Sequence, residues 1–295
     1  MLKIGVIGTG VVGSAIALLL RQKGHIITGV CSKNGITAAK LAASVECQCY
    51  HNPIDILSDG EIIILSTPDR ELEGLAHLLA DSGRVKAEQV FYHMSGVLPA
   101  QVLHPLQDAG ATVGSIHPLQ SFATIEKAIE NIPGSFFAIQ GDDKASQLAL
   151  PIVEDLSGEA FKLRSEDKAL YHLGACVASN YLVGLIHFAV NLYKEIGMSE
   201  VQATKALMPL IRGTVANIVE LGPVKALTGP LARGDISTIE KHLHALEVLN
   251  PGLTEVYKTM GRYTTLVAEK KGSIDNTVAE KLLCVFQREE QIDVQ

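Results

Sequence analysis

Lys3-Ile4-Gly5-Val6-Ile7-Gly8-Thr9-Gly10-Val11-Val12-Gly13-Ser14-Ala15 is the stretch of sequence that decides the fold. The apolar run 4–7 predicts a buried strand, and the apolar run 15–20 predicts a helix. The glycines between them have the G-x-G-x-x-G spacing of a dinucleotide-binding turn. Gly8 permits the tight turn, Gly10 lets backbone N–H groups approach a pyrophosphate, and Gly13 lets the helix lie close to the strand. A glycine-rich turn that binds nothing is the alternative. The phosphate contacts are expected from Gly8, Thr9, Gly10, Val11, Val12 and Gly13.

The composition is that of a globular chain with enough residues for two domains. Of its 295 residues, 47% are hydrophobic and 19% are charged, which excludes a disordered chain. The net charge of −7 and the lack of long Lys or Arg runs argue against nucleic acid as a partner. We find no apolar run of ~18 residues and no signal peptide, so we expect no membrane partner. Five cysteines without a CxxC pair favour a reduced, cytoplasmic compartment.

One short segment has the residue types of a metal site. Cys47, Cys49 and His51 alternate, so they would share one face of a strand. A fourth ligand is not evident in the sequence, and zinc sites with protein ligands usually need one. We therefore expect no metal.

The end of the second predicted strand, residues 26–32, indicates which dinucleotide is bound. An NAD site carries an acidic residue here, which accepts a hydrogen bond from a ribose hydroxyl. This strand instead ends in Ser32, Lys33 and Asn34, whose hydroxyl, ammonium and amide groups suit the 2′-phosphate of NADP. The sequence therefore predicts NADP(H), although Lys33 also fits an ordinary solvated loop lysine.

Two further predicted strands end in polar residues. Because ligands of a doubly wound sheet bind outside the carboxyl ends of its strands, these residues are candidates for ligand contact. The strand 61–65 is followed by Ser66, Thr67 and Pro68, which we expect beside the cofactor ribose or nicotinamide. The strand 90–94 is followed by Ser95, which is either a substrate or nicotinamide contact or a plain turn serine.

A histidine and a glutamine follow the predicted strand 111–116. His117 precedes a proline, which holds it in an extended conformation, so its ring can point into a cleft. Gln120 lies three residues further on, and both are candidates for substrate binding. A structural, hydrogen-bonded histidine is the alternative for His117.

The periodicity changes from strand to helix near residue 167 and stays helical. Strands at 136–140 and 160–163 close the first part, so we predict a Rossmann domain over residues 1–164 and a helical domain over 165–295. Residues 167–196 read as one long helix, with Gly197 as the residue after its C-cap. The length of this helix favours a homodimer through the helical domain.

Polar side chains recur along this predicted helix at intervals of four residues. They are Lys168, His172, Cys176 and Asn180. At ~100° per residue, the last three share one face. A polar stripe on an apolar helix either faces a cleft or is hydrogen-bonded within a packed helical core.

The remaining sequence predicts shorter helices and one turn of interest. Ser199 is the expected N-cap of a helix that runs to Val219, and helices at 240–249, 253–270 and after 276 complete the bundle. In the turn 227–235, Thr228 and Arg233 are candidates for binding a carboxylate. The alternative is a simple connector in which Asp235 pairs with Arg233.

These motifs occur together in the order of a known family. They are His93-x-Ser95-Gly96, His117-Pro118-Leu119-Gln120, Tyr171-His172 with Asn180, Leu227-Thr228-Gly229-Pro230 and Arg233-Gly234-Asp235. With its N-terminal glycine turn, the chain resembles bacterial oxidoreductases that have a Rossmann-like domain and a C-terminal helical domain of unknown function. The family is similar in layout to ketopantoate reductase, pyrroline-5-carboxylate reductase and 6-phosphogluconate dehydrogenase.

The resemblance implies both a fold and an activity. The fold is a doubly wound α/β Rossmann-type sheet followed by an all-α domain of the 6-phosphogluconate dehydrogenase C-terminal type. The activity is NADPH-dependent reduction of a small 2-oxo acid, with ketopantoate as the favoured carboxylate substrate. Imine reduction of the pyrroline-5-carboxylate type and NADP(H) sensing without catalysis are the alternatives.

The chain departs from related reductases at one position. Ketopantoate reductases and β-hydroxyacid dehydrogenases carry a lysine four residues before an asparagine on their long helix. If Asn180 is that asparagine, Cys176 stands at the lysine position. His172 or Lys168 would then donate the proton, and Asn180 would orient the carbonyl.

Overall fold

The computed structural model of the protein describes residues 1–287, which form two compact units. The first unit is Met1–Leu182 and the second begins at Val183. The first unit therefore includes the beginning of the long helix, because that segment makes its contacts with the sheet domain. The functional boundary at residue 164 stays a prediction.

The first unit is built on an eight-stranded sheet in the order β3-β2-β1-β4-β5-β6-β7-β8. Neighbouring strands are parallel except β6 and β7, which are antiparallel. The strand order reverses beside β1, which creates the ligand-binding crevice of a doubly wound sheet, so the predicted fold class is confirmed. The strands are β1 (Lys3–Ile7), β2 (Ile26–Cys31), β3 (Gln48–Tyr50), β4 (Ile62–Leu65), β5 (Val90–His93), β6 (Thr112–Pro118), β7 (Phe136–Gly141) and β8 (Glu159–Lys162).

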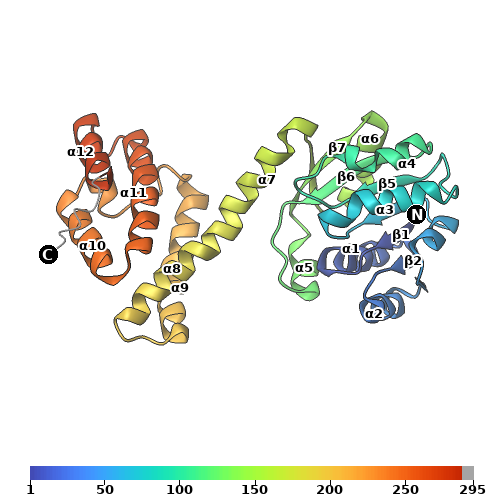
Figure 1. Cartoon of the computed structure of the whole chain (residues 1–295), viewed down its shortest axis with the longest axis horizontal. Coiled ribbons are helices and arrows are strands. Elements are labelled where there is room, and N and C mark those ends of the chain that lie inside the picture. The colour runs from blue at the N-terminus through green and yellow to red at the C-terminus, as the bar shows by residue number, and fades with distance from the viewer. Residues whose placement is uncertain (288–295) are drawn as a thin grey trace. The chain divides into compact units, whose positions relative to one another are not determined.

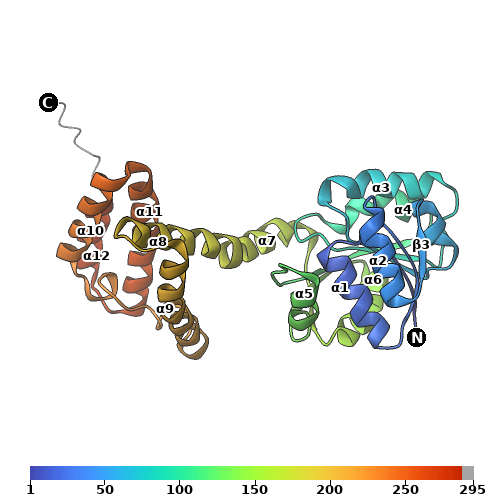
Figure 2. The same ribbon diagram turned by 90° about the horizontal axis from the view of Figure 1, so that it is seen from below.

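Helices cover both faces of this sheet, as Figure 2 shows for α1 and α6 on one side and α3 and α4 on the other. The first face carries α1 (Val11–Gln22), α2 (Gly35–Val45), α5 (Ile125–Asn131) and α6 (Asp143–Asp155). The second carries α3 (Asp69–Asp81), α4 (His104–Asp108) and the 3₁₀ turns η1 (Pro53–Ser58) and η2 (Ala100–Leu103). Each face thus buries its own apolar cluster.

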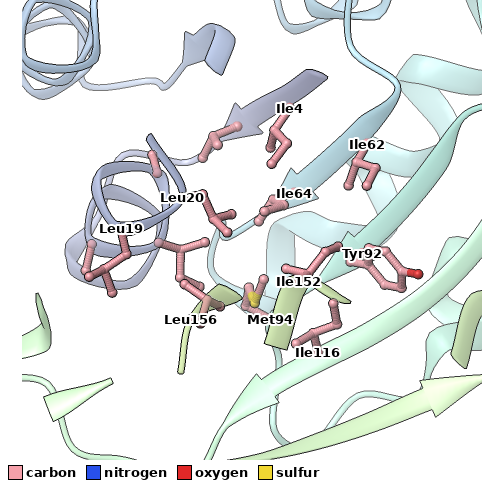
Figure 3. Close-up of a cluster of buried hydrophobic side chains, with 14 of the residues drawn as sticks. Ile4, Leu19, Leu20, Ile62, Ile64, Tyr92, Met94, Ile116, Ile152 and Leu156 are labelled. Carbon is pink, nitrogen blue, oxygen red and sulfur yellow. The ribbon is translucent and has the colours of Figure 1, made fainter. Parts of the chain in front are cut away.

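The larger cluster ties neighbouring strands to the helices above them (Figure 3). Each fully buried side chain of this kind contributes about 1.5–3 kcal/mol of hydrophobic free energy. The hydroxyl of Tyr92 is the polar exception, and it donates a hydrogen bond of 2.6 Å to the carbonyl of Ala145. The fully buried members shown there include Ile4, Leu20, Ile64, Tyr92, Ile116 and Ile152. This packing holds the strands in place, and with them the loops that follow their carboxyl ends.

The predicted long helix is present, with one irregular turn. After the 3₁₀ turn η3 (Ser165–Asp167), it comprises α7 (Lys168–Cys176), the π turn η4 (Val177–Tyr181) and α8 (Leu182–Glu195). Gly197 follows it with φ of 92°, the left-handed conformation expected after a C-cap. The π turn contains Asn180, and such turns occur often at functional sites.

This helix is also more apolar than the sequence analysis expected. Ser165–Glu195 is long and apolar enough, by length and composition, to cross a membrane. The expectation of no such stretch is therefore wrong. Scattered polar residues interrupt the apolar run, but the mean hydropathy of the helix stays as high as that of a membrane-spanning segment. Only 6% of the most apolar window is buried, so the helix presents an apolar surface.

The second unit is helical over its described residues, as predicted (Figure 1). It contains most of α8 together with α9 (Glu200–Leu221), η5 (Leu231–Arg233), α10 (Ile236–Leu249), α11 (Pro251–Lys271) and α12 (Asn276–Gln287). Ser199 caps α9, as predicted, and Asp235 caps α10. The part of the last predicted helix that falls on residues 288–295 lies outside the described residues.

The glycine turn yields a matched pair of stability tests. A methyl group at Gly13 would lie 2.1 Å from Ser66 Oγ and 2.2 Å from the carbonyl of Gly8, whereas one at Gly10 meets no atom within 4 Å. We expect Gly13→Ala to lower the free energy of unfolding by roughly 2–3 kcal/mol, and Gly10→Ala to change it by less than about 1 kcal/mol. Urea denaturation measures both, and equal midpoints would contradict the predicted close packing.

Candidate functional site

A cavity of about 950 Å³ opens where β1, β2 and β4 end. Its size is in the range of cofactor and ligand pockets. Its walls contain most of the residues that the sequence predicted for the cofactor, together with Thr37, Arg70 and Glu71, which the sequence did not predict. The predicted residues in the wall are Gly8, Thr9, Gly10, Ser32, Lys33, Asn34, Ser66, Thr67 and Pro68.

The geometry of the glycine turn fits a bound phosphate. Gly8 has φ of 103°, and a Cβ there would lie 2.6 Å from the backbone of Ser66. Gly10, in contrast, faces open space and is the N-cap of α1 without any side-chain hydrogen bond. The N–H groups of the first turn, at Val11, Val12 and Gly13, are therefore available to an anion. Val11, Val12 and Gly13 are not part of the cavity wall, so only their backbone N–H groups are candidates for contact with a ligand.

The far side of the cavity is polar and charged. The side chain of Asn34 caps α2 by accepting from the N–H groups of Ile36 and Thr37, which leaves its NH₂ group free to donate. Lys33 is a solvent-exposed lysine that forms an ion pair with Glu71. The hydroxyl of Thr67 is buried without a hydrogen-bond partner in the described structure, as expected where a ligand supplies one.

A second group of polar residues lies where β5 ends and along β6, around a buried lysine. Lys168 is 1% exposed, and its Nζ donates to the carbonyl of Ser95 at 2.9 Å and to the hydroxyl of Ser115. Within the described part of the chain it forms no ion pair. Burial lowers its pKa to about 8, and the charge of Asp69 opposes this fall only in part. The ammonium group is therefore a cation without a bonded counter-ion at neutral pH.

Two histidines beside this lysine are held neutral. His93 is fully buried, its Nδ1 accepts from the N–H of Ser95 at 3.1 Å, and burial lowers its pKa to about 3. Burial and the charge of Lys168 lower the pKa of His117 to about 4. The Nδ1 of His117 lies 2.7 Å from the hydroxyl of Tyr171, whose pKa burial raises to about 12. The tyrosine therefore keeps its proton at physiological pH.

The rings of His172 and His117 are neighbours, and both lie close to Gly96. Their rings lie edge to face with centroids 6.1 Å apart, and a Cβ at Gly96 would lie 2.6 Å from His172 Nδ1 and 2.7 Å from His117 Nε2. The Nδ1 of His172 is buried and has no hydrogen-bond partner in the described structure. Its Nε2 lies 3.5 Å from the Sγ of Cys176, so these two members of the predicted stripe do meet.

The remaining predicted site residues have surroundings of their own. The side chain of Gln120 accepts from the N–H of Ser121 and faces the segment before β7. Asn180 is exposed in the π turn of the first unit. Thr228 and Arg233 are exposed residues of the second unit. Asp235, which the alternative interpretation of this turn paired with Arg233, accepts from the N–H and hydroxyl of Thr238 and caps α10.

The structure gives Ser95 hydrogen bonds within a turn and adds residues that the sequence did not single out. The hydroxyl of Ser95 accepts from the N–H groups of Val97 and Leu98, which is the role of a turn serine, while its carbonyl binds Lys168. Ser115 lies within β6, where no sequence motif marked it as a site residue. Arg70 and Glu71 come shortly after Pro68, with Asp69 between, so charged residues just beyond a strand end were the signal that could have revealed them.

Comparison with known proteins finds two family models, one after the other along the chain. Residues 1–118 match the family model of a Rossmann-like domain, and residues 135–264 match that of a domain of unknown function, DUF2520. No curated protein sequence matches the chain.

Solved structures share the fold over most of the chain. Protein TM1727 from Thermotoga maritima is 27% identical with a TM-score of 0.72, and the alignment covers 91% of this chain and 99% of that one. BF3122 from Bacteroides fragilis, described as an NADP oxidoreductase, is 24% identical with a TM-score of 0.73 and coverages of 90% and 98%. A reductive aminase from Aspergillus terreus, in complex with NADPH and ethyl-5-oxohexanoate, is 16% identical with a TM-score of 0.61 and coverages of 98% and 93%. The chain is thus one of the proteins in which a Rossmann-like domain precedes the DUF2520 domain, as its sequence motifs implied.

Proposed function

We propose that the protein is a cytoplasmic NADP(H)-dependent oxidoreductase that reduces the carbonyl group of a small 2-oxo acid, with 2-dehydropantoate (ketopantoate) as the first candidate. The observation that carries this proposal is the buried, uncompensated ammonium group of Lys168, on the same edge of the sheet as the nucleotide cavity. The proposed site uses residues of the first unit alone, without Thr228 and Arg233.

The support for NADP(H) comes from the cavity walls. Free N–H groups at the start of α1 suit the pyrophosphate, and the cations Lys33 and Arg70 suit the 2′-phosphate. Ser66, Thr67 and Pro68 edge the cavity on the side of β4, where we place the ribose and nicotinamide. When bound, the reduced nicotinamide would supply a hydride. The solved aminase with this fold is itself a complex with NADPH.

Lys168 would stabilise the negative charge of the substrate and the negative charge that develops on its carbonyl oxygen during reduction. A 2-oxo acid brings a carboxylate, and its carbonyl oxygen gains negative charge as the carbon is reduced. A fixed cation in a site of low dielectric stabilises such charge more than it would in water. An ammonium group has three N–H donors, and two are used by Ser95 and Ser115, so one remains for a ligand.

His172 is the proposed proton donor, with Lys168 as the other candidate. The Nδ1 of His172 is buried and has no hydrogen-bond partner in the described structure, so a proton carried there is not shared with another protein group. His117 is a poorer donor, because a pKa of about 4 leaves it without a second proton at neutral pH. We assign to His117 and Tyr171 the positioning of the His172 ring, and to Asn180 the orientation of the carbonyl.

Imine reduction is the second candidate, supported by the fold shared with the reductive aminase. The charge of the cluster speaks against it, since Lys168 would repel a protonated imine. A protein that binds NADP(H) without reducing anything is the third candidate, because Cys176 stands where related reductases carry lysine.

A substrate panel separates these functions. We expect the purified protein to consume NADPH with 2-oxo acids, followed by absorbance, and fastest with ketopantoate. Faster turnover of pyrroline-5-carboxylate would select the imine reductase instead. Tight NADPH binding without consumption across the panel would indicate the sensor, and no binding of NADPH would contradict all three.

Replacement of Lys168 tests its charge. The ammonium form is needed, so the rate of the wild-type protein should fall as the pH rises through about 8. Lys168→Met should lower kcat/KM by about 100-fold and remove this alkaline decline, while NADPH affinity stays the same. Lys162→Met is the control, because Lys162 is an exposed lysine that pairs with Asp143. A Lys168→Met enzyme with the rate and pH profile of the wild type would refute the assigned role.

We also propose that the protein is a homodimer through its helical surfaces. Exposed apolar side chains occur along the long helix and along α9, and exposed apolar surface on a helix often marks an interface. A second copy is a better occupant than a lipid bilayer, because α9 also carries charged residues that would be costly in hydrocarbon. The exposed residues are Leu170, Leu173, Val177 and Val183 on the long helix, and Val201, Leu210 and Val219 on α9.

Light scattering after size-exclusion chromatography measures the assembly directly. We expect twice the chain mass of 31.5 kDa for the wild type. Leu210→Glu should shift the protein toward monomer, because it places a charge in the apolar face, whereas Lys205→Glu on the same helix should not. A monomeric wild type at micromolar concentration would contradict the dimer, and a requirement for detergent would point to a membrane instead.

A further inference from the structure

Three charged side chains meet at the wall of the nucleotide cavity. Lys33 follows β2, while Arg70 and Glu71 stand in the first turn of α3. The carboxylate of Glu71 accepts a hydrogen bond from Lys33, and its Oε1 lies 3.6 Å from the Nε of Arg70. The carboxylate therefore lies between two cations, on the side of the cavity where β2 ends.

This carboxylate replaces a residue that the end of β2 lacks. NAD sites place an acid after this strand to accept a hydrogen bond from the ribose 2′-hydroxyl. Residues 32–34 contain no acid, but Glu71 of α3 pairs with Lys33 and lines the same cavity wall, close to the end of β2. One location thus holds an acceptor suited to a hydroxyl and two cations suited to a phosphate.

We propose that Glu71 is an internal counter-ion that sets the cofactor preference of this protein. It would accept from the 2′-hydroxyl of NADH, and it must release Lys33 and Arg70 before they can bind the 2′-phosphate of NADPH. This inference rests on the proposed function in one respect, namely that the cavity binds a pyridine dinucleotide.

The charges determine the direction of the effect. Lys33 and Arg70 carry +2 together and Glu71 carries −1, which leaves +1 to meet a phosphate of about −2. The hydrogen bond and charge of Lys33 hold the pKa of Glu71 below its ordinary value, so the carboxylate stays ionised at neutral pH. Without that carboxylate, the two cations would balance the phosphate.

The exposure of the three side chains makes the exchange feasible. The side chains of Lys33 and Arg70 are 85% and 84% exposed, so they can turn toward a phosphate without unpacking the core. The same exposure screens their charges, so the effect on affinity is moderate and decreases with added salt. Glu71 therefore weakens the preference for NADPH without abolishing it.

Nucleotide titrations of matched variants test this role. Fluorescence titration gives Kd values for NADPH and NADH, and calorimetry compares 2′,5′-ADP with 5′-AMP. Glu71→Gln should raise the preference for NADPH over NADH by about 5- to 10-fold, and Arg70→Gln should lower it by a similar factor. Glu73→Gln is the control, because it removes the same charge from an exposed position on the same helix outside the cavity wall.

The outcomes separate this inference from the function on which it rests. Binding of NADPH with an unchanged preference in Glu71→Gln would overturn the counter-ion role and leave the proposed function intact. An equal change in Glu73→Gln would also overturn it, since the effect would then be one of net charge. No binding of either dinucleotide by the wild-type protein would overturn the proposed function itself.

Discussion

The bond between the ammonium group of Lys168 and the carbonyl of Ser95 is the contact on which the candidate site depends. It joins the first turn of the long helix to the end of β5, and it places a positive charge inside the protein. Desolvation makes an unpaired buried charge costly, so its neighbours must be neutral or accept hydrogen bonds. The carbonyl of Ser95, the hydroxyl of Ser115 and the neutral rings of His93 and His117 meet that requirement.

The two polar regions of the first unit use different electrostatic means. At the glycine turn, anion binding relies on backbone dipoles and uncapped N–H groups, which need no charged side chain. Around Lys168, one buried positive charge helps to lower the pKa values of the neighbouring His93 and His117. Both regions lie at the carboxyl edge of the sheet because parallel strands all end there, and the reversal of strand order beside β1 creates the crevice at the glycine turn.

Much of this arrangement could be predicted from the sequence because it is local. Alternation of strand and helix periods gave the sheet, and the residues after each strand, such as Ser32 and Ser66, were expected at one edge. The contact between Lys168 and Ser95 spans 73 residues, and no local pattern encodes it. The ion pair of Lys33 with Glu71 depends in the same way on how α3 packs beside β2. The long helix has an exposed apolar surface because few other elements pack against it. The periodicity of the sequence predicts a helix but does not show whether its apolar residues are covered.

Gly96 determines how closely the rings of His172 and His117 can approach each other. Two imidazole nitrogens occupy the space that any larger residue would need, so the backbone of Gly96 forms a fixed floor between the rings. A side chain at this position would have to push both rings away, which would change the approach of His172 to His117. The absence of a side chain at residue 96 is thus a geometric condition for the pairing of the two imidazoles.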